Sequence, residues 1–200
     1  MPEIATSFEA EIVHDLPDEL AALIGRVVVA FAKLEHKLTA LTALLLQLNK
    51  AEARIVLKMP RAAERLDMAL DLLAIKDISV ETDTAQLRKL VQEVNEERDL
   101  IAHSIWLQHP ATGELYVRRT RGKWPGHLAT EGPVKRVIFP QSDAFGRPEC
   151  LAALNKILLA MAGVEQLGFE LDKAMVTYPS RFRPPMPVVN PLGITDAQIT

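Results

Sequence analysis

Apolar residues recur every three or four positions along a stretch that begins at Leu20. This spacing places them on one face of an α-helix. Asp18 is a suitable N-cap for it, and Asn49 can take the left-handed conformation that ends a helix. The pattern therefore predicts a long first helix whose buried face carries Leu20, Leu23, Val27, Ala30, Phe31, Leu34, Leu38, Leu41, Leu45 and Leu48.

Two shorter helices are predicted next. One begins near Ala51, and Pro60, which lacks an N–H, is expected to open the other at its first position. This helix covers residues 61–74, and its buried face carries Leu66, Leu70 and Leu73.

The following helix has an arginine on its apolar face. Thr82 or Thr84 can cap it, and Arg98 lies on the same stripe as Leu87, Val91, Val94, Ile101 and Ile105. A desolvated guanidinium costs several kcal/mol unless it is paired or faces a wet cleft. Arg98 is therefore the first candidate for a functional residue.

Beyond this helix the pattern changes to short strand-like runs at residues 105–108, 115–120 and 134–139, with a turn at Thr112 and Gly113. We expect a β-hairpin or small antiparallel sheet, inserted at about residues 106–141 into a single helical domain over residues 1–175.

The last third of the chain predicts one more helix and a tail. The helix opens at Pro148, and residues 176–200 are Pro-rich and expected to be extended. The buried face predicted for this helix consists of Leu151, Leu154, Leu158, Met161, Val164, Gly168 and Leu171.

Composition favours a soluble protein of a reducing compartment. The chain has 200 residues, 48% of them apolar, which is enough for one hydrophobic core. Cys150 is the single cysteine, so an intramolecular disulfide is excluded, and no Cys/His cluster suggests zinc or another metal. The N-terminus lacks a secretory pattern, and charges interrupt the apolar residues 20–48. We expect a cytoplasmic protein with no cofactor and no membrane span.

Basic residues are concentrated in the expected insertion, although the net charge is −3. Such a segment can form a groove for a phosphate backbone, with Tyr116 and Trp124 available to stack on bases. A solvated charged hairpin is the alternative. The basic residues are Arg118, Arg119, Arg121, Lys123, Lys135 and Arg136.

Residues 98–103, Arg-Asp-Leu-Ile-Ala-His, fit the pattern Arg-polar-x-x-x-His near the end of a helix. In these residues, and more weakly in residues 31–35, the chain resembles the HEPN superfamily. The resemblance implies a mainly α fold, a bundle of four to five helices. It also implies a homodimer in which Arg98 and His103 of both subunits meet in one cleft.

Many members are metal-independent ribonucleases of toxin–antitoxin or phage-defence systems, so RNA and a cognate antitoxin are the implied partners. The toxins paired with nucleotidyltransferases carry a tyrosine where this chain has Ile105, so regulation by adenylylation is not supported.

The residue types suit RNA cleavage without a metal. Histidine exchanges protons near neutral pH, and arginine stabilises the negative charge of the transition state. Residues five apart lie about 140° apart around a helix, so one chain is not expected to bring Arg98 and His103 together well. Arg98 is expected to reach the cleft either by its length or through the dimer partner. Asp99 and His103 are four apart, so Asp99 can orient the imidazole. Glu35 is expected to be a structural partner of Arg98.

The alternative to an enzyme is a non-catalytic helical dimerisation or binding module for RNA, a nucleotide or a protein. In that case Arg98 and Glu35 form a salt bridge at the core edge and His103 is solvated. Other chemistries lack their motifs: there is no phosphate-cradling glycine loop and no paired-histidine metalloprotease motif. Cys150 lacks the second cysteine of a zinc deaminase.

Overall fold

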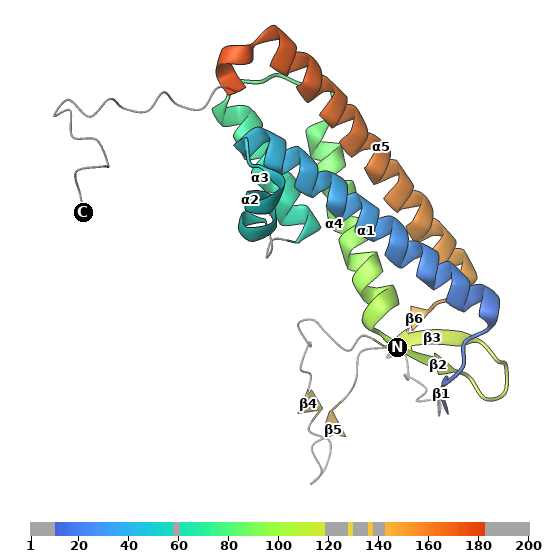
Figure 1. Ribbon diagram of the computed structural model, residues 1–200. Helices are drawn as coiled ribbons and strands as arrows, with labels where there is room; N and C mark the ends of the chain where they lie inside the picture. The colour runs from blue at the N-terminus through green and yellow to red at the C-terminus, as the bar shows by residue number, and fades with distance from the viewer. Residues whose placement is uncertain (1–10, 58–60, 119–127, 130–135, 138–142, 183–200) are drawn as a thin grey trace, which may run out of the picture.

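The computed structural model describes residues 11–57, 61–118, 128–129, 136–137 and 143–182. Helices dominate these residues and pack side by side in an elongated bundle, with a small antiparallel sheet at one end (Figure 1). This confirms the mainly α class with a small antiparallel sheet.

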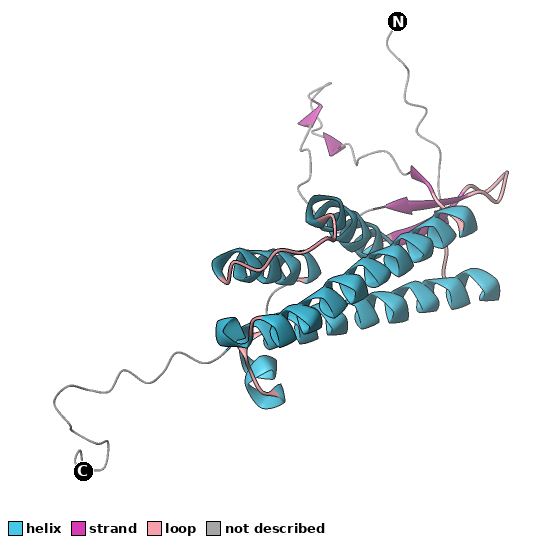
Figure 2. Cartoon of the chain, turned by 90° about the horizontal axis from the view of Figure 1, so that it is seen from above, coloured by secondary structure: helices cyan, strands magenta, loops and turns pink. Residues whose placement is uncertain are grey.

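The helices of the described residues are α1 (Asp18–Leu46), α2 (Lys50–Val56), α3 (Ala62–Ile75), α4 (Thr84–His103) and α5 (Arg147–Thr177). Helix α1 packs against α3, α4 and α5, and α4 also packs against α3 and α5. Helices α1 and α5 both leave the sheet end of the bundle, whereas α4 runs back to it. Figure 2 shows the two long helices, α1 and α5, side by side.

The core confirms the apolar face predicted for the first helix. Every position of that face from Leu20 to Leu45 is buried, and Leu48 is partly buried. Phe31, Leu34 and Leu38 are almost completely inaccessible to solvent. Burying each such side chain contributes about 1.5–3 kcal/mol, which makes α1 the central element of the bundle.

The helix ends differ from the predicted ones because a neighbouring residue supplies each cap. Pro17, not Asp18, is the N-cap of α1, and Gln47, not Asn49, takes the left-handed conformation at its end, with φ 58°. Asn49 instead caps α2: its side chain accepts hydrogen bonds from the amides of Ala51 and Glu52.

Helix α4 is capped by Asp83, between the two threonines proposed from the sequence. Its carboxylate accepts a hydrogen bond of 2.9 Å from the Gln86 amide. Leu87, Val91, Val94 and Ile101 are buried as predicted, whereas Ile105 is partly exposed and already belongs to a strand.

The buried face of α5 was only partly predicted. Leu154, Val164 and Leu171 are buried, but Leu158 is 50% exposed. The residues that fill the core alongside those three are Cys150, Ala153, Ile157, Ala160 and Leu167. Small residues on this face allow close helix packing: a Cβ at Gly163 would lie 2.8 Å from Leu87.

Among the described helices, α5 alone is long and apolar enough to cross a membrane by length and composition. Its most apolar window has a mean hydropathy of 1.4, and 39% of that window is buried inside the protein. Helices of a protein core meet the same criterion, and α5 packs against both α1 and α4.

The main sheet has the antiparallel order β1-β2-β3-β6, with strands Glu11–Ile12, Ile105–Gln108, Leu115–Arg118 and Asp143–Ala144. The predicted hairpin is present as β2 and β3, with Gly113 in the left-handed region at φ 72°. Of the third predicted strand, at residues 134–139, the structure describes only β5 (Arg136–Val137), which pairs with β4 (Leu128–Ala129). In the main sheet it is β6 that pairs with β3.

The predicted tail begins too early. Helix α5 continues to Thr177, and a 3₁₀ helix follows at Pro179–Phe182. Phe182 is 8% exposed and belongs to the core, with the ammonium of Lys76 5.7 Å from its ring centre. A proline is compatible with the first position of a helical turn, so Pro179 does not prevent this one. The remaining prolines of the predicted tail lie outside the described residues.

Candidate functional site

The candidate site lies at the C-terminal end of α4, where the helix meets the sheet. His103 is the last residue of α4, and β2 begins after the single residue Ser104. His103 is exposed. The central position of β2, between β1 and β3, fixes the direction in which the helix ends.

Arg98 lies on the apolar face of α4, and its guanidinium is placed over an aromatic ring. Its guanidinium carbon lies 5.2 Å from the ring centre of Phe31, a buried residue of α1. Arg98 is 28% exposed; its Nε is buried, whereas Nη1 makes polar contacts near the helix end. A cation over an aromatic face is stabilised by about 0.5–2 kcal/mol.

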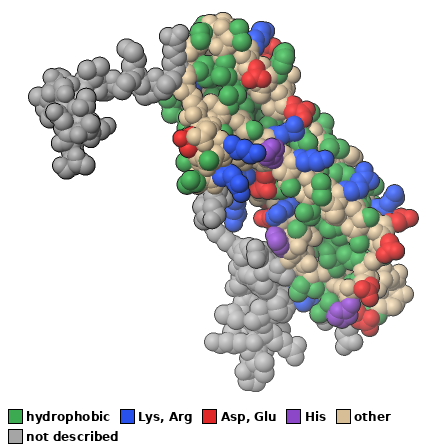
Figure 3. All heavy atoms as spheres, viewed as in Figure 1, with side chains coloured by type: hydrophobic (Ala, Val, Ile, Leu, Met, Phe, Trp, Pro, Cys, Tyr) green, Lys and Arg blue, Asp and Glu red, His purple; other side chains and the backbone are tan. Residues whose placement is uncertain are grey.

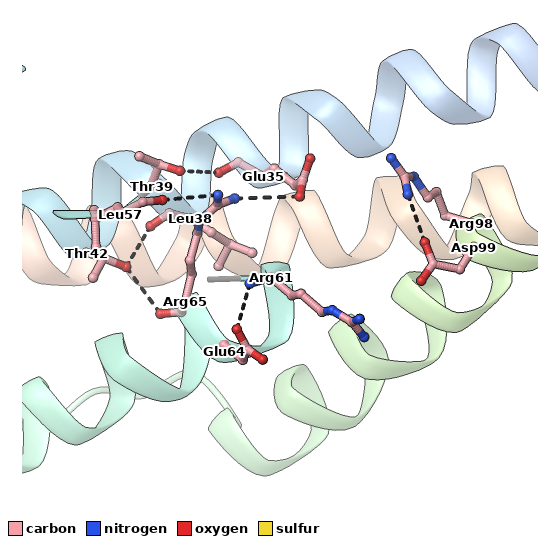
Figure 4. Close-up of polar contacts among 10 residues, drawn as sticks. All are labelled: Glu35, Leu38, Thr39, Thr42, Leu57, Arg61, Glu64, Arg65, Arg98 and Asp99. Atoms are coloured by element: carbon pink, nitrogen blue, oxygen red, sulfur yellow. Dashed lines mark hydrogen bonds and ion pairs between the residues drawn. The ribbon is translucent and has the colours of Figure 1, made fainter. Parts of the chain in front are cut away.

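The tip of Arg98 contacts two residues of its own helix. One guanidinium nitrogen, Nη1, donates to Oδ1 of Asp99 at 2.8 Å, the ion pair drawn in Figure 4. The same nitrogen lies 3.4 Å from Nε2 of His103. Asp99, Arg98 and His103 therefore form a row of carboxylate, guanidinium and imidazole, in which the carboxylate of Asp99, expected to orient the imidazole, pairs with Arg98.

Of the two ways in which Arg98 was expected to reach the site, its own length or a dimer partner, length is sufficient to bring it to His103 within one chain. The two residues do point to different sides of an ideal helix, but the arginine side chain is long enough to bend along the helix toward its end. The pair is assembled within one subunit, so the contact between these two groups does not require a second copy.

The expected ion pair between Arg98 and Glu35 is also wrong. Glu35 on α1 pairs with Arg65 of α3 at 3.6 Å, and Arg65 donates a second bond of 3.3 Å to the carbonyl of Leu57 (Figure 4). Arg65 is only 12% exposed, and it ties α3 to α1 and to the end of α2. Glu35 therefore supports the packing next to the site rather than the guanidinium of Arg98.

The predicted RNA-binding residues are described only at their beginning. Arg118, in β3, is partly buried, whereas Arg119, Arg121, Lys123 and Trp124 lie outside the described residues. Tyr116, one of the two proposed stacking residues, donates a hydrogen bond of 2.6 Å to Glu114. That hydrogen bond raises the pKa of the Tyr116 hydroxyl above its usual value.

The sequence did not predict that Phe31 and Arg65 border the candidate site. Phe31 was assigned to the core, which is correct, but its ring also holds Arg98. The weaker likeness over residues 31–35 was the available signal for it. Nothing in the local sequence distinguishes Arg65 from the exposed arginines of other helices.

Within the described residues, no group of three or more His, Cys, Asp or Glu side chains is arranged to hold a metal ion. The chemistry available at the end of α4 is that of an imidazole beside a guanidinium, open to solvent at His103. Comparison with known proteins finds no matching family model, no matching curated protein and no matching solved structure.

Proposed function

We propose that this protein is a metal-independent endoribonuclease of the HEPN type, acting in the cytoplasm as a homodimer and as a toxin or phage-defence component. The observation that carries the proposal is the 3.4 Å distance between Arg98 and His103 at an exposed helix end. These are the two residue types that the reaction requires, and they lie close enough to contact one phosphate together.

In the proposed reaction the 2′-hydroxyl of RNA attacks the adjacent phosphorus. The 2′-oxygen loses its proton, the bond to the 5′-oxygen breaks, and the leaving oxygen gains a proton. His103 takes or gives one of these protons, a contribution of about 10²–10⁴-fold in rate. Arg98 stabilises the charge that builds on the phosphate oxygens, and Asp99 is a positioning residue that holds the guanidinium. The products carry a 2′,3′-cyclic phosphate and a 5′-hydroxyl.

The substrate path is proposed to continue over the basic segment. Arg118, Arg119, Arg121 and Lys123 would contact phosphates, and Trp124 would stack on a base. A cognate antitoxin is the proposed protein partner, and it would inhibit the nuclease.

The test compares two histidine substitutions in the presence of EDTA. His103→Ala should lose RNA cleavage by about 10²-fold or more, whereas His14→Ala, at an exposed histidine before α1, should cleave like the wild type. The assay follows labelled RNA and identifies the cyclic phosphate at the new 3′ end. Equal cleavage by wild type and His103→Ala would overturn the proposal.

A non-catalytic binding module is the second candidate, and one observation favours it. The guanidinium of Arg98 is already held by the Phe31 ring and neutralised by Asp99, as expected of a structural arginine. This function predicts that the wild type binds RNA, a nucleotide or a protein through this same surface without cutting RNA.

A further inference from the structure

The start of α3 leaves the last turns of α4 uncovered on one side. Helix α3 runs away from the sheet, and α4 runs back toward it (Figure 1). The ion pair of 2.6 Å between Arg88 of α4 and Asp67 of α3 fixes the register of the two helices. Counting six residues from this pair toward the sheet in each helix brings Arg61 level with Val94. Helix α3 therefore does not extend beside residues 95–103, which we call the α4 end.

Arg61 is the N-cap residue of α3, and its side chain points toward the α4 end. Its backbone amide donates a hydrogen bond of 2.8 Å to the carboxylate of Glu64. Arg61 is exposed, and Figure 4 shows its side chain leaving the start of α3 in the direction of Asp99. Along the helix axis Asp99 lies about 7.5 Å beyond the level of Val94. An extended arginine side chain covers most of that distance.

Within the described residues, the guanidinium of Arg61 forms no ion pair, unlike those of the two other arginines near the α4 end. Arg65 pairs with Glu35, and Arg98 pairs with Asp99. The guanidinium of Arg61 therefore keeps its donors for a ligand, and its planar fork fits two oxygens of a phosphate. Figure 3 shows Lys and Arg side chains gathered near the middle of the face that the view presents.

We propose that Arg61 binds the phosphate next to the scissile one, so that the site holds two successive phosphates of an RNA strand. The scissile phosphate contacts Arg98 and His103. Asp99, toward which Arg61 points, lies about 6 Å before His103 along α4, a separation comparable to that of successive phosphates in a nucleic-acid strand. The inference rests on the proposed function and adds that the substrate is a strand with at least two phosphodiesters rather than a dinucleotide.

The carboxylate of Asp99 lies between the two proposed phosphate positions and is compatible with both. An unpaired carboxylate there would repel the strand. Arg98 neutralises it at 2.8 Å from one side, and Arg61 points toward it from the other. Asp99 is 44% exposed, so its side chain can turn toward the guanidinium that is not occupied by a phosphate.

The test measures binding of an RNA tetranucleotide whose 2′-hydroxyls are methylated, because such a strand has no nucleophile and stays intact. Arg61→Gln should weaken its binding roughly three- to tenfold. The slope of log affinity against log salt should fall by about 0.7, the value for one phosphate contact on a single strand. Arg61→Lys keeps the charge and should retain the slope. Lys173→Gln removes an exposed cation of α5 far from the sheet, so it should bind like the wild type.

Neutral methylphosphonates, introduced at one phosphate at a time, assign each arginine to its phosphate. The effect of Arg61→Gln should vanish when its own phosphate is neutral, and the effect of Arg98→Gln should vanish at the neighbouring position. Three results would each overturn the proposal: no binding of the tetranucleotide by the wild type, unchanged affinity of Arg61→Gln, or assignment of both arginines to one phosphate.

These measurements also separate the second phosphate position from the nuclease. Binding that depends on Arg61, with unmodified RNA left uncut, would contradict the nuclease alone. Cleavage by Arg61→Gln with the KM and the salt dependence of the wild type would contradict the second phosphate position alone.

Discussion

Two arginines on neighbouring helices face α1 and are used in different ways. Arg65 of α3 is 12% exposed, and its partners belong to other elements: Glu35 of α1 and the carbonyl of Leu57 beyond α2. Arg98 of α4 is 28% exposed, and its polar partners, Asp99 and His103, are on its own helix.

The difference indicates which of the two can act on a ligand. Arg65 joins three parts of the chain, so moving it would disturb the packing. Arg98 rests on Phe31 and its tip points to the end of α4, where another negatively charged group could replace Asp99. An arginine whose partners are local and partly solvated can exchange them without unfolding the bundle.

The largest expected effect concerns catalysis. If the proposed nuclease is correct, Arg98→Ala reduces RNA cleavage by about 10²–10³-fold, because it removes a donor to the transition state. Arg65→Ala should leave the cleavage rate of the folded protein within a few-fold of wild type. Single-turnover rates measured on both variants would separate the two arginines. Equal losses would mean that both act through the structure.

The second effect concerns stability and has the opposite order. Arg65→Ala leaves the Leu57 carbonyl and the Glu35 carboxylate without their cation, which should lower the free energy of unfolding by about 1–3 kcal/mol. Arg98→Ala removes a partly solvated pair and the contact with the Phe31 ring, and should cost about 0.5–2 kcal/mol. Urea denaturation of both variants measures this. A larger loss for Arg98→Ala would show that its contact with Phe31 is a main support of the core.

The smallest effect is expected for Asp99→Asn. The amide keeps a hydrogen-bond acceptor for Arg98 but loses the charge, and the side chain is 44% exposed, so stability should change by less than about 1 kcal/mol. Cleavage should change far less than in His103→Ala, because Asp99 only positions the guanidinium. A loss as large as that of His103→Ala would place Asp99 among the reacting groups.

Elements whose two faces differ clearly in hydrophobicity could be predicted from the sequence. The buried face of α1 is correct from Leu20 to Leu45, because its apolar residues recur with the helical period, and β2 has its predicted bounds. The faces of helix α5 differ little in hydrophobicity. Leu158 and Leu159 are both exposed although they are as apolar as the buried residues, so periodicity could not identify the buried face.

The site could be predicted only as a set of residues. The positions of Arg98, Asp99 and His103 on one helix end follow from the sequence, but their contacts do not. The distance between Arg98 and His103 depends on how a long side chain bends. The partner of Glu35 depends on how α3 packs, since Arg65 lies 30 residues away in the sequence.

The short connection between α4 and the sheet has a consequence for the binding of any ligand at this site. Ser104 alone separates His103 from a strand that is hydrogen-bonded on both sides. The backbone at His103 therefore has little conformational freedom to lose when a ligand binds. Affinity at such a position is reduced less by ordering than it would be on a loop, because the chain was ordered when it folded.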